Sequence, residues 1–157
     1  MNEVSNVVRW IGDVNVPIYE EVMQKIEKLK DCSAPVTLMI TSEGGYLPVA
    51  IDFTEEMRIR GFKFNTLGIG RIASAAIPVF LSGEHRSMGF HSHLLFHIPD
   101  VSDYDDQEKK QNMKNWYIDF IKDHSNLSRE KVIELSENET LIDAKKAKEF
   151  NLIDEII

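Results

Sequence analysis

The stretch VTLMITSEGG, residues 36–45, decides the fold because it joins a buried strand to a helix. Val36–Ile40 is a short apolar run, which is typical of a strand that is covered on both faces. The pair Gly44-Gly45 then turns the chain. A helix is predicted next, because apolar residues recur at helical spacing in one stripe that consists of Tyr46, Val49, Phe53 and Met57. A strand followed directly by a helix is the repeating unit of α/β proteins.

The same alternation extends in both directions from this unit. Further strands are predicted at Val7–Ile11, Phe64–Ile69 and Leu94–His97. The helix before Val36 has an apolar stripe that consists of Ile18, Val22, Ile26 and Leu29. The helix after Ile69 is Ala-rich, opens at Ser74 and ends near Ser82-Gly83. Four strands that alternate with three helices predict an α/β fold with a mainly parallel sheet and right-handed crossovers.

The C-terminal third has a different character. Residues 100–106 are acidic and predicted to be irregular, and a long amphipathic helix with the stripe Met113, Trp116, Tyr117, Phe120 and Ile121 follows. A short helix capped by Asn126 or Ser128 runs through Leu135, and a second one capped by Asp143 runs through Phe150. Asn151 then takes a position that often requires a left-handed conformation. A last strand is predicted at Leu152–Ile157.

Length and composition limit the function classes. The chain has 157 residues, which suits one domain over residues 1–157 with a substantial core. Its net charge of −8 argues against a nucleic-acid partner. It has no apolar run of the length of a membrane helix and no basic start of a signal peptide. Cys32 is the only cysteine, which suits a reducing compartment, and we therefore expect a cytoplasmic protein.

Three sequence features suggest acyl transfer by a serine. Ser74 lies between small residues at a predicted strand-to-helix junction, where helix N–H groups could stabilise an oxyanion. Gly44-Gly45 falls at the carboxyl end of a neighbouring parallel strand, where ligands of open α/β sheets bind. His97, a potential base, ends a strand of the same sheet. Taken one at a time, each has an ordinary alternative: Ser74 as a helix N-cap, the glycines as a tight turn, and His97 as a structural histidine.

The histidines also raise the alternative of a metal site, because His91, His93 and His97 share strand parity. A zinc site needs a fixed, nearly tetrahedral ligand set with supporting hydrogen bonds. Alternation is uncertain near the turn after Gly89, where His91 and His93 fall. We therefore expect no metal.

Four blocks of the chain resemble the peptidase subunit of the ATP-dependent Clp protease, within the ClpP/crotonase superfamily. Residues 40–45 resemble the family's I-N-S-P-G-G, and residues 70–76 resemble its G-x-A-A-S-M-G. Residues 95–99 resemble M-I-H-Q-P, and residues 141–154 resemble F-L-S-A-x-E-A-x-x-Y-G-L-V-D. The resemblance covers most of the chain from Arg9 onward. It implies a ClpP/crotonase-like spiral of β-α-β units with a handle helix.

The resemblance also implies roles for individual residues. Ser74 would be the nucleophile and His97 the general base. Backbone N–H groups of Gly45 and Ala75 would form the oxyanion hole. Glu139 stands at the position of the family's third triad member, usually an Asp. The implied activity is that of a serine endopeptidase acting on unfolded or short polypeptides, with no cofactor.

Assembly is implied as well, since family members form rings stacked through handle helices. Trp116, Tyr117 and Phe120 are then candidate interface anchors, and an intramolecular core face explains them equally well. Only about eight residues precede Arg9, so the family's N-terminal segment looks absent and docking of a Clp-type ATPase is expected to be absent or altered.

Other functions on this fold stay open at this point. Glu43 replaces the family's proline and places a carboxylate near the oxyanion loop, and Asn138 lies beside Glu139 as a poorer third residue. One alternative is a specialised, virus-type maturation protease. Another is a non-catalytic subunit that only assembles with an active partner. An acyl-CoA hydratase-like role is weaker, because that branch of the superfamily usually has a longer chain.

Overall fold

The computed structural model describes residues 6–31 and 33–157, and its first half alternates strands with helices. Helix α1 begins at Val16 because the Asn15 side chain accepts a hydrogen bond from the Ile18 N–H, 2.9 Å away, and Pro17 suits the first turn. The elements are β1 (Val7–Ile11), α1 (Val16–Leu29), β2 (Val36–Ser42), α2 (Leu47–Arg60), β3 (Phe64–Ala73), α3 (Ala76–Leu81) and β4 (Arg86–Met88).

The second half carries short strands and three further helices. Asp106, Ser128 and Asp143 cap the three helices with side-chain oxygens. The elements are β5 (His93–Leu95), α4 (Gln107–Asp123), α5 (Arg129–Glu137), β6 (Leu141–Asp143), α6 (Ala144–Glu149) and β7 (Glu155–Ile156).

The sheet is mainly parallel, and the long strand β3 organises it. The order is β1-β2-β3-β4-β7, with every neighbouring pair parallel. The first half of β3 pairs with β4, and its last three residues pair with β5. Two short strands therefore pair one after the other with the same edge of β3. β6 pairs antiparallel with β5. This arrangement confirms the α/β fold with a mainly parallel sheet, and it brings the ends of β3, β5 and β6 together.

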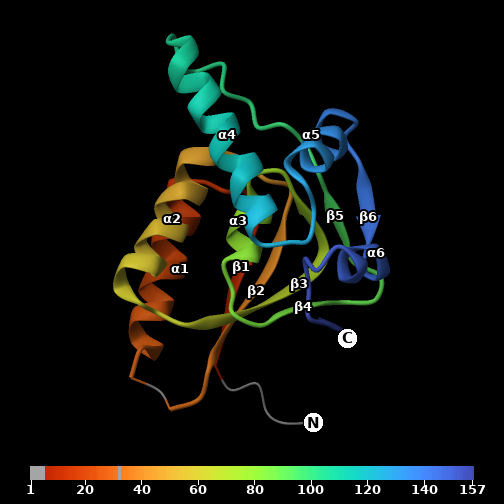
Figure 1. The fold of residues 1–157 in the computed structure, drawn as a ribbon. Coiled ribbons are helices and arrows are strands. Elements are labelled where there is room, and N and C mark those ends of the chain that lie inside the picture. The colour runs from red at the N-terminus through yellow and green to blue at the C-terminus, as the bar shows by residue number, and fades with distance from the viewer. Residues whose placement is uncertain (1–5, 32) are drawn as a thin grey trace.

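Helices cover the sheet and close its core. Figure 1 shows α1 and α2 side by side on one side of the sheet, while β5, β6, α5 and α6 lie on the opposite side of the molecule. The Trp10 and Phe53 rings pack edge to face at 5.3 Å in the fully buried centre. The N-terminal part of α4 projects beyond the rest of the chain (Figure 1). In the part of the chain that the structure describes, no helix has the length and hydropathy needed to cross a membrane.

Several predicted strand boundaries are wrong. β3 does not stop at Ile69 but runs to Ala73, because Arg71, Ile72 and Ala73 pair with β5. β5 ends at Leu95, so His97 lies two residues beyond the strand instead of ending it. The last strand is limited to residues 155–156. β4 and β6 were not predicted at all, since a three-residue strand is too short to show a period.

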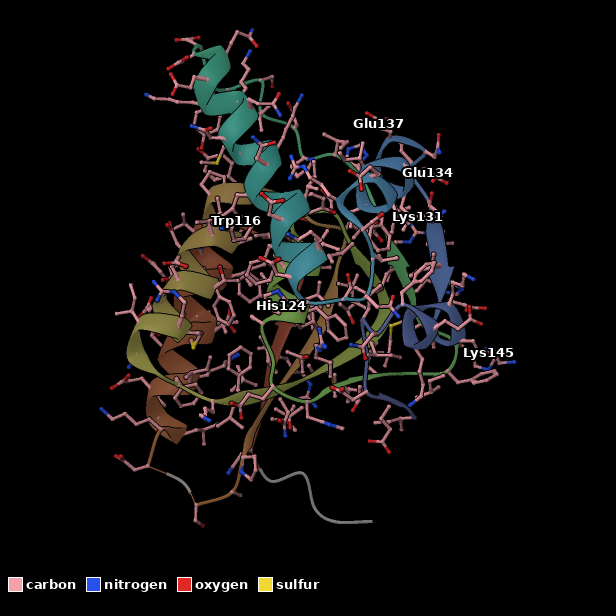
Figure 2. All side chains as sticks on the ribbon, viewed as in Figure 1. Trp116, His124, Lys131, Glu134, Glu137 and Lys145 are labelled. Atoms are coloured by element: carbon pink, nitrogen blue, oxygen red, sulfur yellow. The ribbon has the colours of Figure 1, made fainter. Side chains whose placement is uncertain are left out.

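The helix predictions need smaller corrections. Tyr46 precedes α2 as its N-cap residue and is largely exposed, whereas Val49, Phe53 and Met57 form the buried stripe. Ser128 caps α5. Tyr117 is fully buried within the chain's own core, so the core explanation holds for this residue. Figure 2 shows Trp116 partway along α4 and His124 at its C-terminal end, where the Phe120 ring stacks on the His124 ring with centroids 4.1 Å apart.

Candidate active site

Ser74 occupies a strained turn directly after β3. Its φ is 50°, a left-handed conformation that is uncommon for a residue with a side chain. The Ser74 N–H donates to the Leu95 carbonyl at the end of β5, 3.0 Å away, which fixes the turn against the neighbouring strand. The N-cap of α3 is Ala75, so the alternative of an ordinary N-cap serine is wrong. The turn presents the Ser74 side chain at the sheet edge instead of using it to cap the helix.

The glycine pair after β2 packs directly against this turn. A Cβ atom on Gly44 would lie 2.8 Å from the Ala73 carbonyl oxygen and 2.9 Å from Ser74 Cβ. A Cβ atom on Gly45 would lie 2.6 Å from the Val14 carbonyl oxygen. Both glycines also have positive φ values, of 97° and 150°. Only glycines therefore allow this loop to approach Ser74 on one side and Val14 on the other.

His97 and Glu139 meet on the far side of the same edge. His97 Nδ1 lies 3.0 Å from Glu139 Oε1, and both side chains are partly exposed. The backbone supports this contact, because the Phe96 N–H donates to the Thr140 carbonyl at 2.9 Å. The contact uses Nδ1 of the imidazole, which leaves Nε2 for a second partner.

Ser74, His97 and Glu139 line one cleft of about 290 Å³, together with Glu43, Ala73 and Leu95. Ser74 as a whole residue is only 9% exposed. Among the hydrogen bonds of the described residues, none joins Ser74 Oγ to His97 or to any other group. Such a bond often tightens only when substrate is bound. A larger, shallow depression of about 540 Å³ lies along α1 and α2, and none of these three residues lines it.

Two backbone N–H groups beside Ser74 lack an acceptor in the described part of the chain. These groups belong to Gly45 and Ala75. The neighbouring Gly44 N–H is used differently, since it donates to Ser42 Oγ at 3.1 Å. Backbone N–H groups that are free and fixed by a rigid turn can stabilise an oxyanion without reorganising.

Two further carboxylates belong to the surroundings of the cleft. Glu43 Oε2 lies 3.3 Å from Arg71 Nη1 in an exposed pair. The Ser102 backbone N–H, 2.8 Å from Asp100 Oδ1, lowers the pKa of the Asp100 carboxyl, and His97 contributes less to the same shift. Asp100 therefore lies within electrostatic reach of His97.

The structure brings most of the sequence candidates together. Ser74, His97 and Glu139 share the cleft, and Gly45 and Ala75 flank the serine turn. Asn138 does not line this cleft and serves as the C-cap of α5. In the described residues, 6–31 and 33–157, no group of three potential ligand side chains is placed to hold a metal ion. Arg71 and Asp100 were not predicted from the sequence, because their positions depend on long-range strand pairing and on a local turn.

Comparisons with known proteins agree with this architecture. The chain is 27% identical to the ATP-dependent Clp protease proteolytic subunit of Bacteroides fragilis, over 81% of this chain and 66% of the relative. It is 23% identical to the ATP-dependent Clp protease proteolytic subunit 2 of Treponema denticola, over 92% of this chain and 78% of the relative. The chain thus spans slightly less than two thirds of the length of the Bacteroides protein.

Solved structures show the same fold. A ClpP1 mutant from Listeria monocytogenes matches with a TM-score of 0.85 and 21% identity, over 97% of this chain and 91% of that one. The ClpP protease catalytic domain from Plasmodium falciparum matches with a TM-score of 0.86 and 18% identity, over 97% of this chain and 84% of that one. The Clp protease family model matches residues 4–157, and the chain therefore belongs to the Clp protease family.

Proposed function

We propose that this chain is a serine endopeptidase in which Ser74 is the nucleophile. One observation carries the proposal: the His97–Glu139 contact of 3.0 Å lies in the same cleft as Ser74, whose strained turn leaves its side chain without a partner in the described residues. A serine, an imidazole and a carboxylate at one site form the arrangement that activates a hydroxyl for acyl transfer.

In the proposed reaction, Ser74 Oγ attacks the carbonyl carbon of the scissile peptide bond. His97 Nε2 takes the hydroxyl proton and passes it to the leaving amine, so the C–N bond breaks and an acyl-enzyme forms. Water then attacks the ester carbonyl, and His97 takes a proton from the water and returns it to Ser74 Oγ, so the ester C–O bond breaks and the acid product leaves. Glu139 accepts a hydrogen bond from His97 Nδ1–H, which fixes the tautomer and stabilises the imidazolium. No metal or organic cofactor takes part in these steps.

The oxyanion hole is assigned to the backbone N–H groups of Gly45 and Ala75. Both groups lack an acceptor among the described residues, and both lie beside the Ser74 turn. Donors that are already oriented stabilise the tetrahedral intermediate more than the ground-state carbonyl. The close packing of Gly44 on Ser74 supports this role, because it holds the two donor-bearing loops together.

The proposed substrates are unfolded or short polypeptides, and the proposed assembly is a homo-oligomeric ring. Several large apolar side chains are exposed on the isolated chain, among them Ile11, Ile59 and Phe90, which supports burial against further copies. Light scattering that finds only monomer over a wide concentration range would contradict the ring. We place the enzyme in the cytoplasm, because a single cysteine suits a reducing compartment.

Labelling with a fluorophosphonate probe tests the mechanism directly. The wild type should label at Ser74 and cleave model peptides. Ser74→Ala should abolish labelling, and Ser74→Ala and His97→Ala should each reduce turnover by several powers of ten, because the residues act as a unit. Ser128→Ala is the matched control, since Ser128 is an N-cap serine. Equal cleavage by wild type and Ser74→Ala would refute the mechanism, and assembly without any labelling would favour the non-catalytic alternative.

A further inference from the structure

Among the described residues that line the Ser74 cleft, Glu43 is the charged one that the proposed reaction does not use. It lies in the loop between β2 and α2, directly before Gly44-Gly45. Its side chain is 67% exposed and lines the cleft together with Ser74 and His97. A substrate whose scissile carbonyl approaches Ser74 therefore meets an exposed carboxylate next to the proposed oxyanion hole.

The charge of Glu43 is only weakly compensated. In the described part of the chain its ion-pair partner is Arg71, and Arg71 does not line the cleft. The Arg71–Glu43 distance of 3.3 Å joins one guanidinium nitrogen to one carboxylate oxygen, and both side chains are about half exposed or more. Such pairs are weak and exchange partners readily. A cationic group in the cleft can thus compete with Arg71 for Glu43.

The other carboxylate that lines the Ser74 cleft adds a second negative charge to that of Glu43. Glu139 lines the cleft and contacts His97. An acidic substrate side chain would be repelled by both carboxylates, whereas a lysine or arginine would be attracted chiefly by Glu43, because Glu139 is already in contact with His97. Both carboxylates line the same cleft as Ser74, a residue that is nine-tenths buried and whose hydroxyl lacks a hydrogen-bond partner among the described residues, so they act where a substrate would react.

We propose that Glu43 is a specificity-determining residue that makes the cleft prefer peptides with a lysine or arginine close to the scissile bond. The inference rests on the proposed serine peptidase function and names its substrate class. Arg71 moderates the preference, because it competes with the substrate cation for the same carboxylate.

The preference for lysine should correspond to the free energy of one exposed ion pair. That corresponds to a gain of about two- to fivefold in kcat/KM for lysine over the neutral glutamine at the same position. The gain should shrink with added salt, because the Debye length falls from about 10 Å at 0.1 M to about 3 Å at 1 M.

The test uses a neutral fluorogenic peptide in which lysine, glutamine or glutamate replaces one flanking residue at a time. The lysine-to-glutamine ratio of kcat/KM is measured for the full chain at low and high salt. Glu43→Gln should bring the largest ratio to about one, and Arg71→Gln should raise it above the wild-type value. Glu55→Gln is the control, since Glu55 is an exposed, Arg58-paired glutamate on α2 outside the cleft lining.

Fluorophosphonate labelling of the same samples separates this inference from the function on which it rests. If Ser74 labels but the wild type and Glu43→Gln give the same ratio at every position, the inference is wrong and the serine peptidase function stands. If the ratio falls with Glu43→Gln and rises with Arg71→Gln, the inference is confirmed. If neither labelling nor cleavage occurs, both proposals are overturned.

Discussion

Helices α5 and α6 end in the same backbone conformation, but with different residues at the critical position. After α5, Glu139 has a φ of 49°, and the Thr140 N–H donates to the Leu135 carbonyl at 3.0 Å. After α6, Asn151 has a φ of 56°, and the Leu152 N–H donates to the Ala147 carbonyl at 2.9 Å. Both are Schellman motifs, in which glycine is the preferred left-handed residue and asparagine the next choice. Glutamate is therefore the unusual residue of the two.

The two positions differ in what their side chains can reach. Glu139 contacts His97 in the cleft, whereas Asn151 contributes its backbone carbonyl, which accepts from Arg86 Nη2 at 3.4 Å. A left-handed residue with a Cβ costs about 1–2 kcal/mol, and such strain tends to persist where function requires the side chain. The comparison supports the role proposed for Glu139, since the poorer residue for the turn lies next to the serine and the histidine.

The largest expected effect is on peptide turnover, which should depend on Glu139 and not on Asn151. Glu139→Gln keeps the size of the side chain but removes the charge that stabilises the imidazolium. We expect peptide turnover to fall by about a hundredfold or more. Asn151→Gln and Asn138→Ala should leave turnover unchanged, because neither residue lines the cleft. Unchanged turnover in Glu139→Gln would leave Ser74 and His97 as a dyad and would remove the functional difference between the helix ends.

The second prediction asks whether the two helices are otherwise equivalent. Ser128 Oγ accepts from the Lys131 N–H at 3.1 Å, and Asp143 Oδ1 accepts from the Lys146 N–H at 2.8 Å. Ser128→Ala and Asp143→Ala should each lower the free energy of unfolding by about 1 kcal/mol. Denaturant unfolding followed by circular dichroism, at one protein concentration, measures both. A large loss for one cap and none for the other would show that the helices are not comparable.

The third prediction tests the strain at Glu139. Glu139→Gly removes the strain of a side chain on a left-handed backbone, which stabilises the folded state. It also adds backbone freedom to the unfolded chain, which offsets part of that gain. The free energy of unfolding should therefore rise by about 0.5–1 kcal/mol. Turnover should fall as in Glu139→Gln. A variant that is more stable and less active would show that the carboxylate serves the cleft at the expense of the helix end. A less stable Glu139→Gly would mean that the His97–Glu139 contact outweighs the strain.

The smallest effect is expected at the second helix end. Asn151→Gly should raise the free energy of unfolding by only about 0.3 kcal/mol, because asparagine tolerates the left-handed conformation better than glutamate. Turnover should not change. If Asn151→Gly stabilised the protein as much as Glu139→Gly, the residue type would not explain the difference between the two motifs.

The sequence was sufficient for those parts of the fold that have a clear period or cap. The predicted strand at Val7–Ile11 is confirmed without change, and the left-handed conformation predicted for Asn151 is confirmed by its φ of 56°. The stripes of α1 and α2 were visible because amphipathic helices repeat over several turns. β4 and β6 were missed because their pairing partners, and not their own residues, make them strands.

The geometry of the site depended on contacts that no local pattern reveals. The Ser74 turn is tied to Leu95, and the residue before His97 is tied to the residue after Glu139. The left-handed conformation of Glu139 was not predicted, because glutamate is not a typical residue there. The resemblance to a known family indicated which residues meet, whereas physical reasoning from the sequence indicated only that Ser74, His97 and the glycine pair share one sheet edge.

In the loop of Glu43, Gly44 and Gly45, the two glycines do not tolerate substitution by a larger residue, whereas Glu43 does. Gly44 is confined by Ser74 and Gly45 by Val14, so either substitution by a larger residue would displace the backbone on which catalysis is proposed to depend. Glu43 has no such constraint, since its exposed side chain contacts only Arg71 among charged groups of the described chain. Variation at this position can therefore change the charge that a substrate meets without moving the nucleophile. In this loop, substrate preference can evolve one side chain at a time while the neighbouring backbone stays fixed.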